Sequence, residues 1–325
     1  MIPPAQRPVA AWLTTLAGRA PIETHISAVF VGRDTAWKMK KAVRLSFLDF
    51  TDIAERGRLL RHELALNRRT APEIYRDVAG VVCTGGAFAL DPEAGPAEAR
   101  EWVLRMAPVP AEDFLDARAE AGLIDEGLLR AIADTVAFFH LGLPPADLDP
   151  LASLLEVASG NARAAHAAGL PEARLRVLTE RTRMALHARS RWLAARRRDG
   201  FIRRAHGDLH LGNICLWHGK PVLIDALEFD EKLATIDLGY DLAFLLMDLE
   251  RKLGRAAANT VLNRYVARTG DAGLTAGLSP FISLRASVRA HVRKTAGAQD
   301  WERYLAMAEQ ALNPHPPLVV AVGGL

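Results

Sequence analysis

The segment HGDLHLGN, residues 206–213, places two histidines, an aspartate and an asparagine within eight positions. Another aspartate, Asp225, follows at the end of the run PVLID. Such side chains offer oxygen ligands, which suit Mg²⁺, a hard cation that proteins hold with one or two carboxylates and with substrate phosphates. Phosphoryl transfer needs such a set, because one aspartate can orient or deprotonate a hydroxyl while the other ligands hold Mg²⁺. We therefore take Asp208, Asn213 and Asp225 as candidate reaction residues.

The histidines of this segment admit a different chemistry, because HxDxH, with His206 and His210, superficially resembles a metallohydrolase cluster. A zinc site of that kind draws on further histidine or cysteine ligands. No additional histidine cluster or cysteine site accompanies the segment. We favour a packing and loop-orienting role for His206, and a structural or substrate-adjacent role for His210.

A short hairpin is predicted to position these residues. The apolar runs ICLW (214–217) and PVLID (221–225) flank His218-Gly219-Lys220, which is typical of two strands joined by a turn. This hairpin would bring Asn213 and Asp225 to one end of a small ribbon. The chain around it is otherwise helical, with an apolar face over 124–139, long Ala/Leu/Arg patterns over 150–200, and helices again from about Leu238.

The first 107 residues indicate a mixed region. Strand-like runs at 22–31 and 35–43 flank a short turn and predict a hairpin. A helical period follows from Asp52, where Glu55 completes the pattern of a capping box, up to the break at Pro72. Further strands fit 78–83, 87–90 and 101–106.

At this point the sequence resembles a known group. HGDLHLGN followed by VLIDALEF (222–229) is similar to the catalytic loop and metal-binding strand of the aminoglycoside phosphotransferase family, the choline-kinase-like branch of the protein-kinase fold. The resemblance implies an α+β, two-lobed fold, with an N-lobe over 1–107 and a helical C-lobe over 108–312. It also implies Asp208 as catalytic base, Asn213 and Asp225 as Mg²⁺ ligands, ATP or GTP as phosphoryl donor, and a small-molecule hydroxyl as acceptor.

The kinase-like interpretation requires a strand lysine for the nucleotide phosphates and a helix glutamate to pair with it. Lys38 in AWKMKK is the first candidate and Lys40, on the same strand face, is the second, whereas Lys41 points away. Glu63 lies on an apolar helix face, where burying an unpaired carboxylate would be costly, so we expect it to have a cationic partner.

The resemblance also implies where the rest of the nucleotide would bind. Backbone groups near Met106, at the hinge between the lobes, would bind the base. No GxGxxG occurs, so the phosphate loop would be the ETHIS segment, which ends at Ser27. For the acceptor, the candidate residues are His210, Glu228 and the helical stripe of Arg285 and Arg289.

The segments ETHISAVFVGRDTAWKMKKAVRLSFLDF, LALNRRTAPEIY and YDLAFLLMDLE extend the resemblance to bacterial proteins in which this half precedes a P-loop domain. The tail fits that pattern, because the strand-like LVVAV runs into Gly323-Gly324-Leu325, as a phosphate loop begins. We expect residues 313–325 to be a linker and the first strand of such a covalent partner. A non-catalytic nucleotide-sensing module for that partner is the alternative function.

Composition argues against several other classes of protein. Cys83 and Cys215 lie far apart, which argues against a disulfide framework. No basic leader and no apolar run near the roughly 18 residues of a membrane span occur, so we expect a soluble, cytoplasmic protein. Nine arginines fall between Arg181 and Arg204, a possible nucleic-acid footprint, but aromatic stacking residues are nearly absent there. We favour a solvated helix face.

Overall fold

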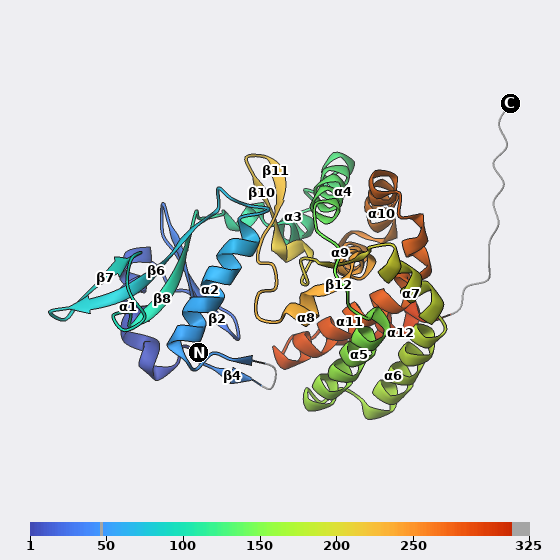
Figure 1. Cartoon of the computed structure of the whole chain (residues 1–325), viewed down its shortest axis with the longest axis horizontal. Helices are drawn as coiled ribbons and strands as arrows, with labels where there is room; N and C mark the ends of the chain where they lie inside the picture. Colours follow the sequence, from blue (N-terminus) through green and yellow to red (C-terminus); the bar gives the residue numbers. More distant parts are fainter. Residues whose placement is uncertain (46–47, 314–325) are drawn as a thin grey trace.

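The computed structural model describes residues 1–45 and 48–313 of the chain. It has a lobe built on an antiparallel sheet and a lobe built mainly of helices, with the β10–β11 hairpin at their junction (Figure 1). The predicted two-lobed α+β fold is therefore confirmed. The predicted strand and glycine run at the C-terminus lie outside the described residues.

Antiparallel strands form the N-terminal sheet in the order β1-β2-β3-β8-β6-β7. The hairpin and the strands that the sequence predicts here are present. Their bounds are β1 Ile22–Glu23, β2 Ser27–Val31, β3 Ala36–Lys40, β6 Tyr75–Thr84, β7 Ala87–Asp91 and β8 Glu101–Met106. A separate pair consists of β4 Arg44–Leu45 and β5 Leu48–Asp49.

Strand β3 separates two different environments because its side chains alternate across the sheet. Met39 faces a cluster that includes Leu13 of α1 (Arg7–Ala17), a helix that the sequence analysis did not predict. Lys38 and Lys40 point to the other face, which is covered by α2 (Ile53–Asn67). The alternation thus places two lysines beneath one helix.

Helix α2 lies close to the sheet. Gly57 allows this approach, because a Cβ atom there would come within 2.7 Å of the Trp102 ring nitrogen. The predicted cap is half right: the Asp52 carboxylate accepts from the Ala54 amide, but Glu55 forms an ion pair with Arg58 instead of completing a capping box. The side chain of Glu55 therefore pairs with the next turn of the helix and does not cap its first turn.

The C-terminal lobe follows the predicted helical pattern. Its helices are α3 Leu115–Glu120, α4 Glu126–Leu141, α5 Pro150–Ala167, α6 Glu172–His187, α7 Ser190–Arg198, α8 Glu231–Ala234, α9 Leu238–Leu253, α10 Arg255–Thr269, α11 Leu278–Thr295 and α12 Trp301–Ala311. Its short strands are β9 Ile202–Arg204, β10 Ile214–Trp217, β11 Lys220–Leu223 and β12 Thr235–Asp237. Of the helices in residues 1–45 and 48–313, none combines the length and apolar character that a bilayer crossing needs.

One hydrophobic cluster spans the two lobes. Leu60 of α2 and Trp102 of β8 belong to the same buried cluster as Cys215 and Ile224 of the β10–β11 hairpin. Because apolar burial is non-directional and proportional to area, this cluster holds the hairpin against the N-lobe without fixing its polar contacts. The polar contacts described below supply that specificity.

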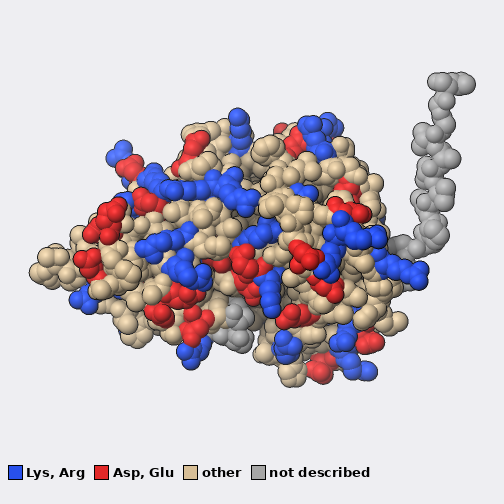
Figure 2. Space-filling model, in the orientation of Figure 1, with Lys and Arg blue, Asp and Glu red and all other residues tan. Residues whose placement is uncertain are grey.

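The arginine-rich segment 181–204 is not simply a solvated face, which corrects the sequence interpretation. Arg196 is buried and forms ion pairs with both Asp237 and Asp271. Arg203 donates to backbone carbonyls, and Arg204 pairs with Glu231. Figure 2 shows acidic side chains beside basic ones on both lobes of the face in view. The solvated face that the sequence predicts is present in part, because Arg183, Arg191, Arg197 and Arg198 are exposed.

The buried Arg196 group generates a stability prediction. Arg196→Leu would leave Asp237 and Asp271 without their cation, so we expect the free energy of unfolding to fall by about 3–5 kcal/mol in urea titrations. Arg197→Leu is the matched control, because the Arg197 side chain is 41% exposed, and it should change the value by at most about 0.5 kcal/mol. Equal losses in the two variants would contradict the assignment.

A half-buried histidine on α11 makes stability depend on pH. Burial lowers the pKa of His291 to about 4. Below about pH 6.5 the unfolded chain therefore binds more protons than the folded one. The contribution of His291 to the free energy of unfolding is thus present at neutral pH and is lost as the pH falls. Between about pH 7 and pH 5 the free energy of unfolding should fall by about 1–2 kcal/mol less in His291→Gln than in the parent. His166→Gln, at an exposed ring, should follow the parent; identical curves for all three proteins would refute the prediction.

Candidate functional site

The β10–β11 hairpin brings Asn213 and Asp225 to one end, as the sequence predicts. Ile214 pairs with Leu223 in the antiparallel register, and the Ile224 amide donates to the Asn213 carbonyl at 3.0 Å. Asp225 is the next residue along the chain. The side chains on either side of the hairpin therefore start from neighbouring backbone positions.

Asp208 and Asn213 are in direct contact. The Asn213 Nδ2 donates to the Asp208 carbonyl and to its Oδ2, each at 2.9 Å. Burial alone would raise the pKa of the Asp208 carboxyl. The neighbouring His210, His206 and Arg285 outweigh that effect, so the pKa lies well below its ordinary value. The side chain is still 41% exposed. Asp208 is thus an ionised carboxylate that a ligand can reach.

A buried aspartate holds the backbone of this loop. Asp241 on α9 accepts hydrogen bonds from the amides of His206 and Gly207, both at 3.0 Å. His140 is fully buried and contacts the same carboxylate at 3.2 Å. Asp241 is fully buried and ionised, and the Arg285 guanidinium lies 3.7 Å from it, so these donors and this cation stabilise the carboxylate and fix the loop relative to α9.

Arg285 supports the loop from behind and does not face an acceptor, which corrects one sequence expectation. Its Nη1 donates to the Gly207 carbonyl at 3.0 Å and its Nε to the Tyr240 carbonyl at 3.2 Å. The guanidinium stacks on the Tyr240 ring at 3.9 Å, and the residue is buried. It therefore positions the loop that carries Asp208.

His206 also has a structural position. Its Nε2 lies 2.9 Å from the Ile224 carbonyl, and burial lowers its pKa despite the nearby Asp241 and Asp208 carboxylates. A neutral, buried ring that donates to the hairpin links the loop to β11. This geometry matches the packing role expected from the sequence.

Lys38 joins the hairpin to the N-lobe. Its Nζ lies 2.7 Å from Glu63 Oε1 and 2.5 Å from Asp225 Oδ1. The predicted pair of strand lysine and helix glutamate is therefore formed, and it extends to the candidate metal ligand. Three segments far apart in the sequence meet at this one ammonium group.

Lys40, the second candidate, is part of the same network. Its Nζ contacts Glu63 Oε2 at 2.9 Å and also forms a hydrogen bond with Glu228 Oε1. Glu228, which the sequence analysis assigned to the acceptor pocket, is buried against this lysine instead. The expectation for Glu228 was wrong because only the fold shows that the chain after Asp225 returns to β3.

Burial and charge oppose each other in this network. Burial raises the pKa of Glu63, but Lys38 and Lys40 outweigh it and hold the pKa at about 2. Burial lowers the pKa of each lysine, but the facing carboxylates raise it above its ordinary value. Burial raises the pKa of Glu228, since only Lys40 contacts it closely. Each charge in the network depends on its partners.

Two residues that the sequence analysis did not assign to the site fix the backbone around Asp225. The Asp225 amide donates to the Tyr75 hydroxyl and the Ala226 amide to Asn67 Oδ1, both at 2.9 Å. Asp225 has a φ of 59°, a left-handed conformation that is uncommon outside glycine and asparagine or aspartate. A non-glycine residue held in this conformation by tertiary hydrogen bonds is typical of functional sites.

The oxygen set at this end of the hairpin fits Mg²⁺. Asp225 has a side chain that is 46% exposed, and one of its oxygens is held by Lys38. Because the Asn213 Nδ2 faces Asp208, its amide oxygen is the ligand atom that it can offer. Oxygen donors without histidine or cysteine are the chemistry that Mg²⁺ prefers. Within the described residues, no cluster of three or more His, Cys, Asp or Glu side chains has the geometry of a metal site.

The remaining nucleotide residues are only partly where the sequence placed them. Ser27 lies within β2, opposite Lys40, and its buried hydroxyl has no hydrogen-bond partner, so it is not part of an exposed phosphate loop. Met106 ends β8 and pairs with Ala36 next to the predicted hinge. The loop over 24–26 remains the nearest equivalent of the predicted phosphate loop.

His210 and Arg289 lie on the side of the loop that carries Asp208. His210 Nε2 is 3.5 Å from Asp208 Oδ2, and its ring contacts Phe244 with centroids 5.3 Å apart. The Arg289 guanidinium carbon is 5.8 Å from the centroid of the same Phe244 ring. These positions keep both residues as acceptor-side candidates.

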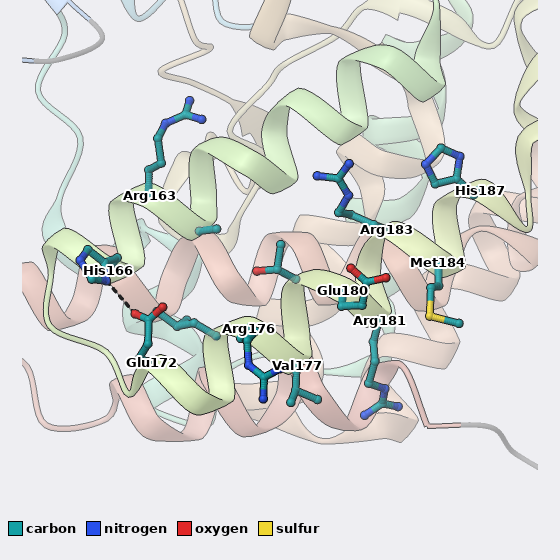
Figure 3. Close-up of a pocket in the computed structure, with 13 residues that line it drawn as sticks. Arg163, His166, Glu172, Arg176, Val177, Glu180, Arg181, Arg183, Met184 and His187 are labelled. Carbon is teal, nitrogen blue, oxygen red and sulfur yellow. Dashed lines mark hydrogen bonds and ion pairs between the residues drawn. The ribbon is translucent and has the colours of Figure 1, made fainter.

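A wide surface groove lies elsewhere, between α5 and α6 (Figure 3). It exposes Val177 and Met184 and mixes acidic with basic side chains, such as Glu180 and Arg183. It shares no residue with the Asp208, Lys38 and Asp225 set. The groove is therefore separate from the side chains that meet at the lobe junction.

The sequence is similar to those of known proteins. A family model described as the phosphotransferase enzyme family matches residues 92–276. An uncharacterized protein of Mycobacterium tuberculosis is 31% identical over 320 residues, which cover 93% of this chain and 61% of that protein. The chain therefore spans about three fifths of the length of the curated relatives that it matches.

Solved structures show the same fold. A choline/ethanolamine kinase family protein from Mesorhizobium loti is similar with a TM-score of 0.57 and 12% identity, covering 95% of each chain. An aminoglycoside phosphotransferase from Streptomyces rimosus is similar with a TM-score of 0.50 and 21% identity, covering 87% of this chain and 99% of that one. A third aminoglycoside phosphotransferase, in complex with GDP and kanamycin, has a TM-score of 0.52 and 14% identity over 93% and 97% of the two chains.

The second lysine generates a stability prediction. Lys40→Met would leave the buried Glu228 without its cation, so we expect a loss of about 3 kcal/mol in the free energy of unfolding. Adding Glu228→Gln should recover part of that loss, because the unpaired charge is removed. Arg44→Met, at an exposed pair with Asp49, should change stability by less than about 1 kcal/mol. Strictly additive effects of Lys40→Met and Glu228→Gln would show that the two groups are not coupled.

Proposed function

Because this chain belongs to the phosphotransferase enzyme family, we propose that it is a kinase that transfers the terminal phosphoryl group of ATP or GTP to a hydroxyl of a small molecule. The observation that carries the proposal is the position of Lys38, which contacts Glu63 and Asp225 at the same time. That contact joins the proposed phosphate-binding strand to the proposed metal ligand. Asp208 and Asn213 lie on the same hairpin end.

In the proposed reaction, Asp208 acts as the base. The acceptor oxygen attacks the terminal phosphorus, the bond from that phosphorus to the bridging oxygen breaks, and the nucleoside diphosphate leaves. The hydroxyl proton passes to the Asp208 carboxylate, which is ionised because its pKa lies below its ordinary value. Asn213 orients Asp208 through its Nδ2 hydrogen bonds.

The N-lobe would hold the donor. A lysine ammonium has three hydrogen-bond donors, and Lys38 uses two of them on Glu63 and Asp225. The third would bind a phosphate oxygen. Mg²⁺, held by Asn213 and Asp225, would neutralise charge on the phosphates. The backbone next to Met106 would bind the base of ATP or GTP.

The alternative is a nucleotide sensor that does not transfer phosphate, serving a covalent P-loop partner. Both functions need the Lys38 and Asp225 network, so binding alone does not distinguish them. They differ at Asp208, which only the reaction requires. The P-loop partner and the cytoplasmic location remain predictions from the sequence.

A thermal-stability titration tests the proposal. ATP and GTP, each with and without Mg²⁺, are added to the parent protein, Asp225→Ala and Asp208→Asn. We expect a Mg²⁺-dependent rise in Tm that Asp225→Ala abolishes and Asp208→Asn keeps. Turnover with an acceptor should fall by about 10²- to 10⁴-fold in Asp208→Asn.

Asp147→Asn is the control for this titration, because the Asp147 side chain is 83% exposed and lies outside the site. It should behave as the parent in both measurements. If neither nucleotide changes the Tm of the parent, the kinase proposal fails. A normal Tm shift with turnover that does not depend on Asp208 would instead support the sensor.

A further inference from the structure

Arg289 on α11 is a half-buried cation. Within residues 1–45 and 48–313 it forms no ion pair, and its Nε is buried without a hydrogen-bond partner. Its guanidinium carbon lies 5.8 Å from the centroid of the Phe244 ring, and the residue as a whole is half-buried. A guanidinium nitrogen that is withdrawn from water costs free energy unless another group supplies a hydrogen bond.

The neighbouring arginines of the same helix face have acidic partners. Arg285, one turn earlier, is buried and donates to the Gly207 and Tyr240 carbonyls, and its Nη2, which has no hydrogen-bond partner, lies 3.7 Å from Asp241 Oδ1. Arg293, one turn later, forms a 2.7 Å ion pair with Asp300. Arg289 lies between them, so its unpaired state is not a general property of this helix surface.

The nearby carboxylates of α9 are also used by the protein. Asp241 accepts from the His206 and Gly207 amides. Asp248 is fully buried and its Oδ2 accepts from the Leu211 amide at 3.1 Å, whereas its Oδ1 has no hydrogen-bond partner among the described residues. Neither lies within ion-pair distance of Arg289.

Arg289 lies close to the proposed reaction centre. The Phe244 ring that it faces is in edge contact with the ring of His210, which is 3.5 Å from the Asp208 carboxylate. His210 is anchored, because its Nδ1 accepts from the Gly212 amide. The path from Asp208 to Arg289 therefore crosses only two side chains, those of His210 and Phe244.

We propose that the acceptor of this phosphotransferase carries an oxyanion, either a carboxylate or a phosphate, and that Arg289 is the residue that selects it. This inference rests on the proposed function, because it assigns a substrate class to the same site. The guanidinium fork matches planar or tetrahedral oxyanions in two parallel hydrogen bonds, which are stronger than neutral ones. A cationic acceptor would be repelled.

Arg289 does not take part in the bond changes. The hydroxyl of the acceptor still attacks phosphorus and gives its proton to Asp208, while the oxyanion of the same molecule is held at Arg289. Binding away from the reacting atoms fixes the acceptor orientation, so loss of Arg289 should raise KM for the anionic acceptor more than it lowers kcat.

Matched sets of acceptors test the inference. One set is glycerate, glycerol 3-phosphate, glycerol and 3-amino-1,2-propanediol, and the other is glucuronate, glucose 6-phosphate, glucose and glucosamine. Within each set the hydroxyl framework is similar and the charge changes. Release of the nucleoside diphosphate is measured for the parent, Arg289→Gln, Arg289→Lys and the control Arg183→Gln, whose side chain lies on the exposed face of α6.

We expect the parent to prefer an anionic member, and the carboxylate and phosphate members show which oxyanion is recognised. Arg289→Gln should raise KM for that member by about 10- to 100-fold while Arg183→Gln leaves it unchanged. Arg289→Lys should recover part of the affinity, since it restores charge without the fork. The nucleotide-induced Tm shift of each variant reports separately on the fold and on the donor site.

Preference for neutral or cationic members would overturn the inference, and so would an anionic KM that does not respond to Arg289→Gln. The inference would also be overturned if no member of either set is turned over while Mg²⁺ and nucleotide still raise Tm. In that case the proposed nucleotide site would be retained. If no nucleotide raises Tm, the proposed function itself has failed.

Discussion

The structure depends on a single buried carboxylate, that of Glu63. It is inaccessible to solvent and would be costly there without compensation, yet its two oxygens each receive a lysine from the same strand. Strand alternation places Lys38 and Lys40 on one face, and the close packing of Gly57 against Trp102 brings α2 near enough to meet them. The geometry of the sheet and the helix is thus constrained by one group.

The two lysines that contact Glu63 also contact carboxylates of the other lobe. Lys38 reaches Asp225 and Lys40 reaches Glu228, so the network contains three carboxylates and two ammonium groups. One negative charge is left over, at the end where Asp225 is exposed. A site with excess negative charge and oxygen ligands favours a divalent cation, which also explains why Asp225, and not Glu228, is accessible.

The sequence predicted the parts whose residue types and spacing are local. Asp208, Asn213 and Asp225 stand within one loop and one hairpin, and Lys38 and Glu63 are defined by the periods of a strand and a helix. It did not predict α1, the inward position of Glu228, or the burial of Ser27. Arg285 and Arg196 were misplaced for a related reason: an arginine looks the same in sequence whether it meets water, a carbonyl or a carboxylate. Those differences arise from tertiary contacts between distant residues.

The distance along the chain between network partners has a consequence for how the protein forms. Lys40 and Glu228 are separated by 188 residues, and Lys38 and Asp225 by 187. During synthesis the N-lobe leaves the ribosome first, with two lysines and a single shared glutamate as partner. Contacts of such high sequence separation form late, after local helices and hairpins. At this face the nascent N-lobe therefore has two lysines and one glutamate, and burying that excess positive charge is unfavourable before Asp225 and Glu228 are in place. We expect the lysines to stay exposed to water until the second lobe packs against the first.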